Sequence, residues 1–105
     1  MTEQIDMQEQ IKQTVTDNDV VLFMKGNASF PQCGFSGKAI QILQALDSKF
    51  VNVDVHSNDE NREGVKVYSN WPTIPQLYVK GAFVGGCDIM TEMYESGELK
   101  ENLEA

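Results

Sequence analysis

Cys33 is the residue whose position offers the clearest chemistry. It follows a stretch of loop composition at residues 25–32 and opens a segment of helical periodicity, so we expect its thiol at a helix N-terminus. The free N–H groups and partial positive charge of such an end stabilise a thiolate, the form that attacks disulfides and binds metals. Lys25, at the end of the preceding apolar run, would add positive charge nearby. The alternative is that Cys33 is a small buried hydrophobe, as free cysteines often are.

The residue three positions after Cys33 is a serine, Ser36, so the segment lacks the second thiol of a C-x-x-C redox pair. A hydroxyl cannot resolve a mixed disulfide, which excludes dithiol exchange within this motif. Two kinds of chemistry remain, namely exchange with an external thiol and ligation of a soft metal centre. On this interpretation Ser36 makes a helix-end hydrogen bond, and its main importance is the thiol that it replaces.

The second cysteine, Cys87, allows two interpretations. The segment Gly85-Gly86-Cys87-Asp88 can present another thiol, or only a backbone amide at the start of a helix, and the amide is favoured. A disulfide between Cys33 and Cys87 under oxidising conditions is a further hypothesis. The single histidine, His56, has no neighbouring ligand set, so we assign it no role.

Length and charge limit the classes of protein that need to be considered. A chain of 105 residues has room for one domain, so we expect residues 1–105 to fold as a unit. A net charge of -8 repels phosphate polymers and anionic lipid, which argues against nucleic acid and membrane partners. Two separated cysteines do not form a secreted disulfide framework, and the acidic N-terminus does not resemble a targeting peptide. We therefore expect a soluble, cytoplasmic protein.

Hydrophobic periodicity predicts alternating helices and strands. Met7, Ile11 and Val15 recur every four residues, which predicts a helix over about residues 2–16. The uninterrupted apolar run Val20–Met24 predicts a strand that is covered on both faces. The same signals predict a helix over about 33–48, a strand at 50–55, a helix from a capping box at 57–60 to about 69, strands at 76–80 and 82–84, a helix from about 88 and a short final helix.

This order of elements predicts an α/β fold. A parallel βαβ half joined to an antiparallel ββα half would form one four-stranded mixed sheet with helices on both faces. Two prolines make residues 71–75 a rigid, non-helical loop, and Trp71 is expected to anchor this loop in the core. Met90, Met93 and Tyr94 have the spacing of a packed helix face, so we expect them in the core as well.

Four motifs, taken in their order and spacing, resemble the monothiol glutaredoxins of the C-G-F-S class, which are single-domain members of the thioredoxin-fold superfamily. They are VLFMKG at 21–26, PQCGFS at 31–36, WPTIPQLY at 71–78 and GGCDIM at 85–90. The resemblance covers nearly all of the chain and implies a thioredoxin-like fold. It also implies a glutathione-binding protein whose homodimer holds one [2Fe-2S] cluster and hands it to apo iron-sulfur acceptors, often with a BolA-like partner.

The same resemblance implies roles for particular residues. Cys33 would be the metal ligand and the reactive thiol, and counting agrees, because two copies of Cys33 and two glutathione thiols supply the four sulfurs of an all-thiolate cluster. Pro75 would be a cis-proline, with a trans turn proline as the alternative. The glutathione site would use the cations of Lys25 and Arg62, the backbone of Ile74 as partner of an added strand, and Cys87 and Asp88 at the γ-glutamyl end. A solvated surface charge is the alternative role for Lys25 and Arg62.

Two functions follow, and both use Cys33. The first is an iron-sulfur carrier and assembly factor with no ordinary substrate turnover, which the C-G-F-S motif favours. The alternative is a glutathione-dependent oxidoreductase that removes glutathione from proteins, with Cys33 as nucleophile and a second glutathione as resolving thiol. A regulatory adaptor that senses iron status through its partners is a third hypothesis.

Overall fold

The computed structural model of the chain describes residues 7–27, 29–55 and 59–104, and in this part the expected order of elements is confirmed. Residues 2–6 of the first expected helix, Ser57 of the expected capping box and His56 lie outside the described residues. The observed elements are α1 (Met7–Asp17), β1 (Val20–Met24), α2 (Gly34–Ala45), β2 (Val51–Asp54), α3 (Asp59–Ser69), β3 (Gln76–Val79), β4 (Ala82–Gly85), α4 (Cys87–Ser96) and α5 (Glu98–Glu104).

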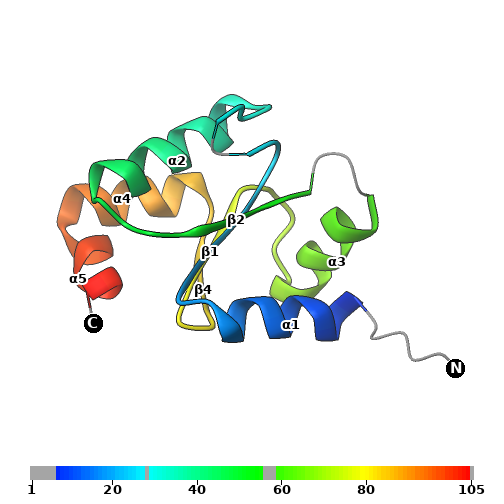
Figure 1. Cartoon of the computed structure of the whole chain (residues 1–105). Helices are drawn as coiled ribbons and strands as arrows, with labels where there is room; N and C mark the ends of the chain where they lie inside the picture. Colours follow the sequence, from blue (N-terminus) through cyan, green and yellow to red (C-terminus); the bar gives the residue numbers. More distant parts are fainter. Residues whose placement is uncertain (1–6, 28, 56–58, 105) are drawn as a thin grey trace, which may run out of the picture.

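The four strands form one mixed sheet in the order β2-β1-β3-β4 (Figure 1). β1 and β2 are parallel, and they are connected through α2, which is the expected βαβ half. β1 pairs with β3 and β3 pairs with β4 in antiparallel fashion, so the second half is the expected ββα unit, ending in α4. β1 lies inside the sheet, where all five of its residues are buried.

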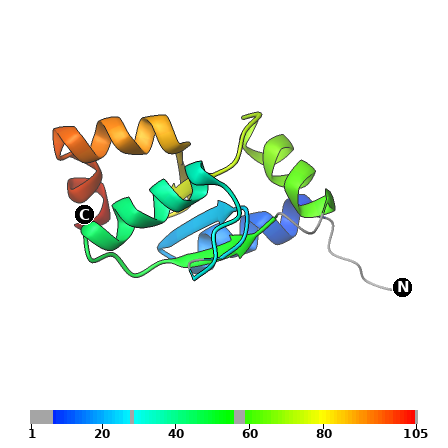
Figure 2. The same ribbon diagram turned by 90° about the horizontal axis from the view of Figure 1, so that it is seen from above.

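Helices cover both faces of the sheet, as the sequence predicts. α1 and α3 lie together on one side, whereas α2 and α4 lie together on the other (Figures 1 and 2). The alternation along β1 divides the core accordingly. Val20, Leu22 and Met24 belong to the cluster with α2, α4 and α5, while Val21 and Phe23 belong to the cluster with α1 and α3. None of the described helices is long and apolar enough to cross a membrane.

A glycine inside α3 allows α1 to approach closely. A Cβ atom at Gly64 would lie 2.4 Å from Cγ of Met7, and the Gly64 carbonyl accepts a hydrogen bond of 2.9 Å from Nε2 of Gln8. Glycine weakens a helix by about 1 kcal/mol relative to alanine. At this position the loss of helix stability is offset by the contact between α1 and α3, which could not pack at this distance with a larger residue in place of Gly64.

Two residues expected in the core are exposed instead. Trp71 is 39% exposed, and its indole ring packs at a tilted angle against the ring of Phe83, with ring centroids 5.9 Å apart. The space beneath the loop is occupied by the Gln76 amide, which bonds to the loop backbone. Tyr94 is 41% exposed, because α4 buries a narrow face centred on Met90, with Met93 at its border. The expectation of core packing was therefore right for the two methionines only.

Candidate functional site

Cys33 is the N-cap residue of α2, as the sequence predicts. Its backbone is extended, with φ at -150° and ψ at 156°, and its Sγ accepts a hydrogen bond of 3.3 Å from the backbone N–H of Ser36. The Cys33 residue is partly exposed. Phe30 precedes it in the sequence and Phe35 follows it, and these two residues are 71% and 65% exposed. The sulfur is thus held by a helix end and remains open to other molecules.

Ser36 does more than replace a thiol. It is completely buried, and its Oγ lies 3.3 Å from Sγ of Cys33. The same oxygen accepts a hydrogen bond of 3.1 Å from the backbone N–H of Lys25 at the end of β1. The Cys33 thiol can donate its hydrogen to this oxygen, and once the thiol is ionised the hydroxyl can instead donate its own hydrogen to the sulfur. The spacing of the motif predicts the helix-end position, but it does not reveal the link to β1.

The pKa of the Cys33 thiol lies below its ordinary value. Partial burial acts to raise this pKa, but several other effects together outweigh it. These effects are the hydrogen bonds from the Ser36 hydroxyl and from the backbone N–H groups of Ser36 and Phe35, and the positive charge of Lys25. A lowered pKa increases the thiolate fraction near neutral pH, so Cys33 has the character of a nucleophile or soft ligand.

The loop between β1 and Cys33 is held by its own hydrogen bonds. The Gly26 N–H donates to Oδ1 of Asp54 over 3.0 Å, and the Gln32 N–H donates to the Lys25 carbonyl over 2.8 Å. Oδ1 of Asn27 accepts hydrogen bonds from two further N–H groups of the loop. Asp54, at the end of β2, is a residue that the sequence analysis missed, since only the parallel pairing of β1 and β2 brings it to this loop.

A cavity of about 230 Å³ lies beside the first turn of α2. Three of the residues predicted for the glutathione site, Ile74, Cys87 and Asp88, come together in its wall. The complete lining consists of Phe35, Trp71, Thr73, Ile74, Pro75, Gly86, Cys87, Asp88 and Ile89. Cys33 itself lines a neighbouring depression together with residues 31, 32, 34, 37, 38 and 41. Phe35, two residues after Cys33, belongs to the cavity lining.

The loop before β3 and the start of α4 have the predicted local structure. The Ile74–Pro75 peptide bond is cis, which confirms the interpretation favoured for Pro75. Cys87 is the first residue of α4, so its backbone amide lies at a helix N-terminus, and the residue is buried. Both cysteines are free thiols in this structure. A disulfide between them stays a prediction.

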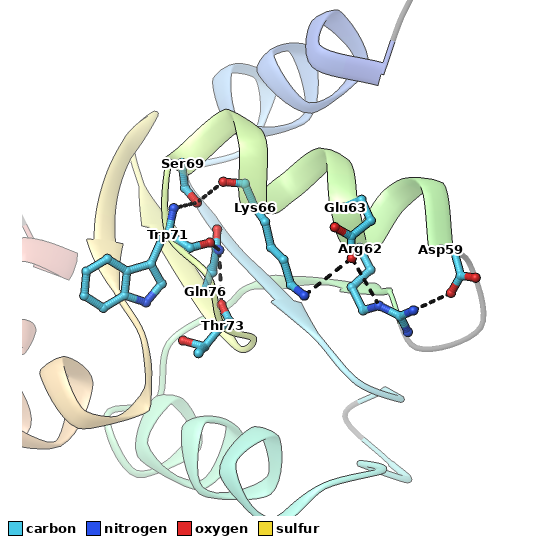
Figure 3. A network of polar contacts seen from close by, with 8 residues as sticks. All are labelled: Asp59, Arg62, Glu63, Lys66, Ser69, Trp71, Thr73 and Gln76. Carbon is cyan, nitrogen blue, oxygen red and sulfur yellow. Dashed lines mark hydrogen bonds and ion pairs between the residues drawn. The ribbon is translucent and has the colours of Figure 1, made fainter.

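The two predicted cations differ in their surroundings. Lys25 lies close enough to Cys33 to lower the pKa of the thiol. Arg62 lies on α3, where it forms ion pairs with Asp59 and Glu63 (Figure 3). Lys66 follows one turn later on the same helix face, with its Nζ 3.5 Å from Oε2 of Glu63. The sequence analysis did not name Lys66, although its i, i+4 spacing from Arg62 puts both basic residues on one helix face.

The sheet order β2-β1-β3-β4, a cysteine at the start of the helix after β1 and a cis-proline just before β3 define a protein of the thioredoxin-like fold. A sequence model of the family described as Glutaredoxin matches residues 20–84. The chain is 57% identical over 94 residues to a ycf64-like monothiol glutaredoxin of Synechocystis, covering 90% of this chain and 88% of that one. It is 46% identical to glutaredoxin 4 of Escherichia coli, with 89% and 81% covered.

Another relative, the chloroplastic monothiol glutaredoxin-S7 of rice, is 52% identical, and the match spans 94% of this chain but 59% of the rice protein. Among solved structures, reduced apo GrxS14 of poplar is similar with a TM-score of 0.80 and 53% identity, over 90% of this chain and 87% of that one. A truncated 1-C-Grx1 of Trypanosoma brucei has a TM-score of 0.84 and 42% identity, over 97% and 92%. The chain belongs to the glutaredoxin family, among its monothiol members.

Proposed function

We propose that this protein binds glutathione and, as a dimer, carries one [2Fe-2S] cluster that it transfers to apo iron-sulfur proteins. The observation that carries the proposal is the state of Cys33, a partly exposed sulfur with a lowered pKa that has a buried hydroxyl beside it in place of a second thiol. Thiolates are the ordinary ligands of such clusters. A sulfur without an internal thiol partner is available to an external group.

The glutathione site would be built from the cavity and the nearby cations. The N-terminus of α4 at Cys87 suits a carboxylate, and the carboxylate of Asp88 suits the amino group of the γ-glutamyl end. The backbone at Ile74 would pair with the extended tripeptide as a strand does. Lys25 and Arg62 would attract the remaining carboxylate, and Arg62 would then exchange its present ion pairs for the ligand.

Ligand number supports a dimer. A [2Fe-2S] cluster of the all-thiolate type needs four sulfurs, and two Cys33 side chains with two bound glutathione thiols supply them. Phe30 and Phe35, both highly exposed near Cys33, would be covered when two chains meet around the cluster. A BolA-like protein and apo iron-sulfur acceptors are the partners we propose. We also propose that this protein works in the cytoplasm, whereas some of its relatives carry chloroplastic and mitochondrial names.

Anaerobic reconstitution tests this function. The wild type, Cys33→Ser and Cys87→Ser would be incubated with iron and sulfide, with and without glutathione, and examined by visible absorption and sizing. We expect a coloured dimer in the wild type and in Cys87→Ser only when glutathione is present, and a colourless monomer in Cys33→Ser. Cluster binding that is independent of glutathione or of Cys33 would contradict the proposal.

The lowered pKa of Cys33 also favours the second function, removal of glutathione from proteins. The Cys33 thiolate would attack the glutathione sulfur of a mixed disulfide, so that the protein thiolate leaves and Cys33 carries glutathione. A second glutathione thiolate would then attack that sulfur, releasing Cys33 as thiolate and forming glutathione disulfide. Turnover of a glutathionylated peptide by the cluster-free wild type, absent in Cys33→Ser, would establish this activity, and Ser36→Cys is expected to increase it.

A further inference from the structure

The buried side-chain amide of Gln76 is hydrogen-bonded to the backbone of the cis-proline loop. Gln76, the first residue of β3, is completely buried, as are the apolar residues that follow it in the strand. Its Nε2 donates hydrogen bonds to the carbonyls of Trp71, over 3.2 Å, and Thr73, over 3.1 Å (Figure 3). Burial of an amide is unfavourable unless its polar atoms are bonded, and here both N–H hydrogens have partners.

The other end of the amide is bonded as well. Oε1 of Gln76 accepts a hydrogen bond of 3.4 Å from the hydroxyl of Tyr78. Burial raises the pKa of that hydroxyl to about 12, so it keeps its proton and remains a donor at ordinary pH. The orientation of the amide is therefore determined by its surroundings, because two carbonyls on one side can only accept and a hydroxyl on the other donates.

These bonds also orient the backbone that lines the cavity. In a trans peptide the C=O and N–H groups point in opposite directions. When Gln76 holds the Thr73 carbonyl on the core side of the loop, the N–H of Ile74 in the same peptide is directed away from Gln76. Ile74 lines the cavity, and its backbone is the group that would pair with glutathione in the proposed strand-like arrangement.

We propose that Gln76 is a positioning residue for glutathione, which it never touches, and that it acts by fixing the direction of the Thr73–Ile74 peptide. This inference rests on the glutathione site proposed above. An apolar residue of similar size could fill the space, since the neighbouring strand positions are apolar, but it would leave both loop carbonyls without these donors. The peptide would then rotate more freely, and the tripeptide would lose a pre-oriented partner.

The test compares Gln76→Met with Leu99→Ala, a substitution on α5 in the core cluster of α2 and α4, which contains no residue of the cavity lining. Unfolding in urea reports the stability of each cluster-free protein, and calorimetry reports its affinity for reduced glutathione. We expect Gln76→Met to bind glutathione roughly tenfold more weakly, the equivalent of one backbone hydrogen bond, and Leu99→Ala to bind it as the wild type does.

A second readout separates loop positioning from general damage to the site. The rate of Cys33 alkylation by iodoacetamide should be unchanged in Gln76→Met, because the groups that lower the pKa of Cys33 are Ser36, Phe35 and Lys25, and none of them bonds to Gln76. Should Gln76→Met fail to fold, Gln76→Asn keeps an amide that is one methylene shorter. Its expected loss of glutathione affinity is severalfold.

The outcomes distinguish this inference from the proposed function. Wild-type affinity for glutathione in Gln76→Met, or in Gln76→Asn if only that variant folds, overturns the positioning role and leaves the function standing. Equal loss of affinity in Gln76→Met and Leu99→Ala, or loss accompanied by slower alkylation of Cys33, also overturns it, because the effect is then one of stability. If the wild type binds no glutathione, the proposed function fails and the inference fails with it.

Discussion

At the scale of single residues, the hydroxyl of Ser36 is the group that most directly adjusts Cys33. It lies against the sulfur and is fixed by the Lys25 N–H, so its contribution depends on an atom of β1 as much as on α2. A thiolate gains more than a thiol from a hydrogen-bond donor, which is why this contact lowers the pKa. The serine in the motif is therefore chemically active although it cannot form a disulfide.

Replacement of this serine should be visible in the pH dependence of alkylation. We expect Ser36→Ala to raise the pKa of Cys33, since it removes a hydrogen bond to the charged thiolate, and such bonds contribute roughly 1.5 to 3 kcal/mol. The measurement is the rate at which iodoacetamide alkylates Cys33, determined at intervals of ~0.5 pH units between about pH 5 and 10. Ser96→Ala, an exposed serine at the end of α4, is the matched control. An unchanged pH profile in Ser36→Ala would contradict this account.

At the scale of elements, the close contact of α1 with α3 depends on Gly64. Gly64→Ala would gain about 1 kcal/mol of helix propensity but would force its Cβ against Met7, and overpacking of this kind typically costs about 1 to 3 kcal/mol. We therefore expect a net loss of stability in urea unfolding. Met7→Ala in the same chain removes the obstructing side chain, so Gly64→Ala should be neutral or stabilising in that background. Additive effects of the two substitutions would show that the contact is not the cause.

The third strand contains a group that makes stability depend on alkaline pH. The pKa of Tyr78 is raised to about 12 by burial, so the folded state holds this proton more tightly than the unfolded state, in which the pKa is near 10. The resulting contribution is fully present below pH 10 and is lost as the pH rises toward 12. We expect the wild type to lose on the order of 1 kcal/mol more stability than Tyr78→Phe over this range. Parallel curves from urea unfolding at successive pH values would rule this out.

At the scale of the whole molecule, charge is unevenly balanced. Sixteen acidic residues against eight basic ones repel one another in the compact state, whereas the ion pairs of Arg62 and Lys66 gather on one helix, α3. Added salt screens both effects, but the excess of like charge is the larger of the two. We expect the midpoint of urea unfolding to rise between about 10 and 200 mM sodium chloride, over which the Debye length falls from about 30 to below 10 Å. A falling midpoint would show that the ion pairs dominate.

Much of this fold was predictable because its signals are local. The four-residue spacing of Met7, Ile11 and Val15 and the apolar run of β1 report burial directly, and both predictions are confirmed. The position of Cys33 at a helix start followed from the loop before it, whereas the cis peptide at Pro75 followed only from the resemblance to the monothiol glutaredoxins. Local patterns suffice for these features because helix periodicity, strand alternation and capping each involve neighbours in the chain.

The remaining features depend on which distant segments meet. The N–H of Lys25 finds Ser36, and that of Gly26 finds Asp54, 28 positions later, only once β1, α2 and β2 are assembled. Trp71 looked like a core residue by its type, but the space beneath its loop is taken by Gln76, whose amide donates to two backbone carbonyls, whereas an indole has a single N–H. Hydrophobic type and spacing predict that a segment is buried. The three-dimensional packing decides which polar groups are buried with it, because each of them must find a partner there.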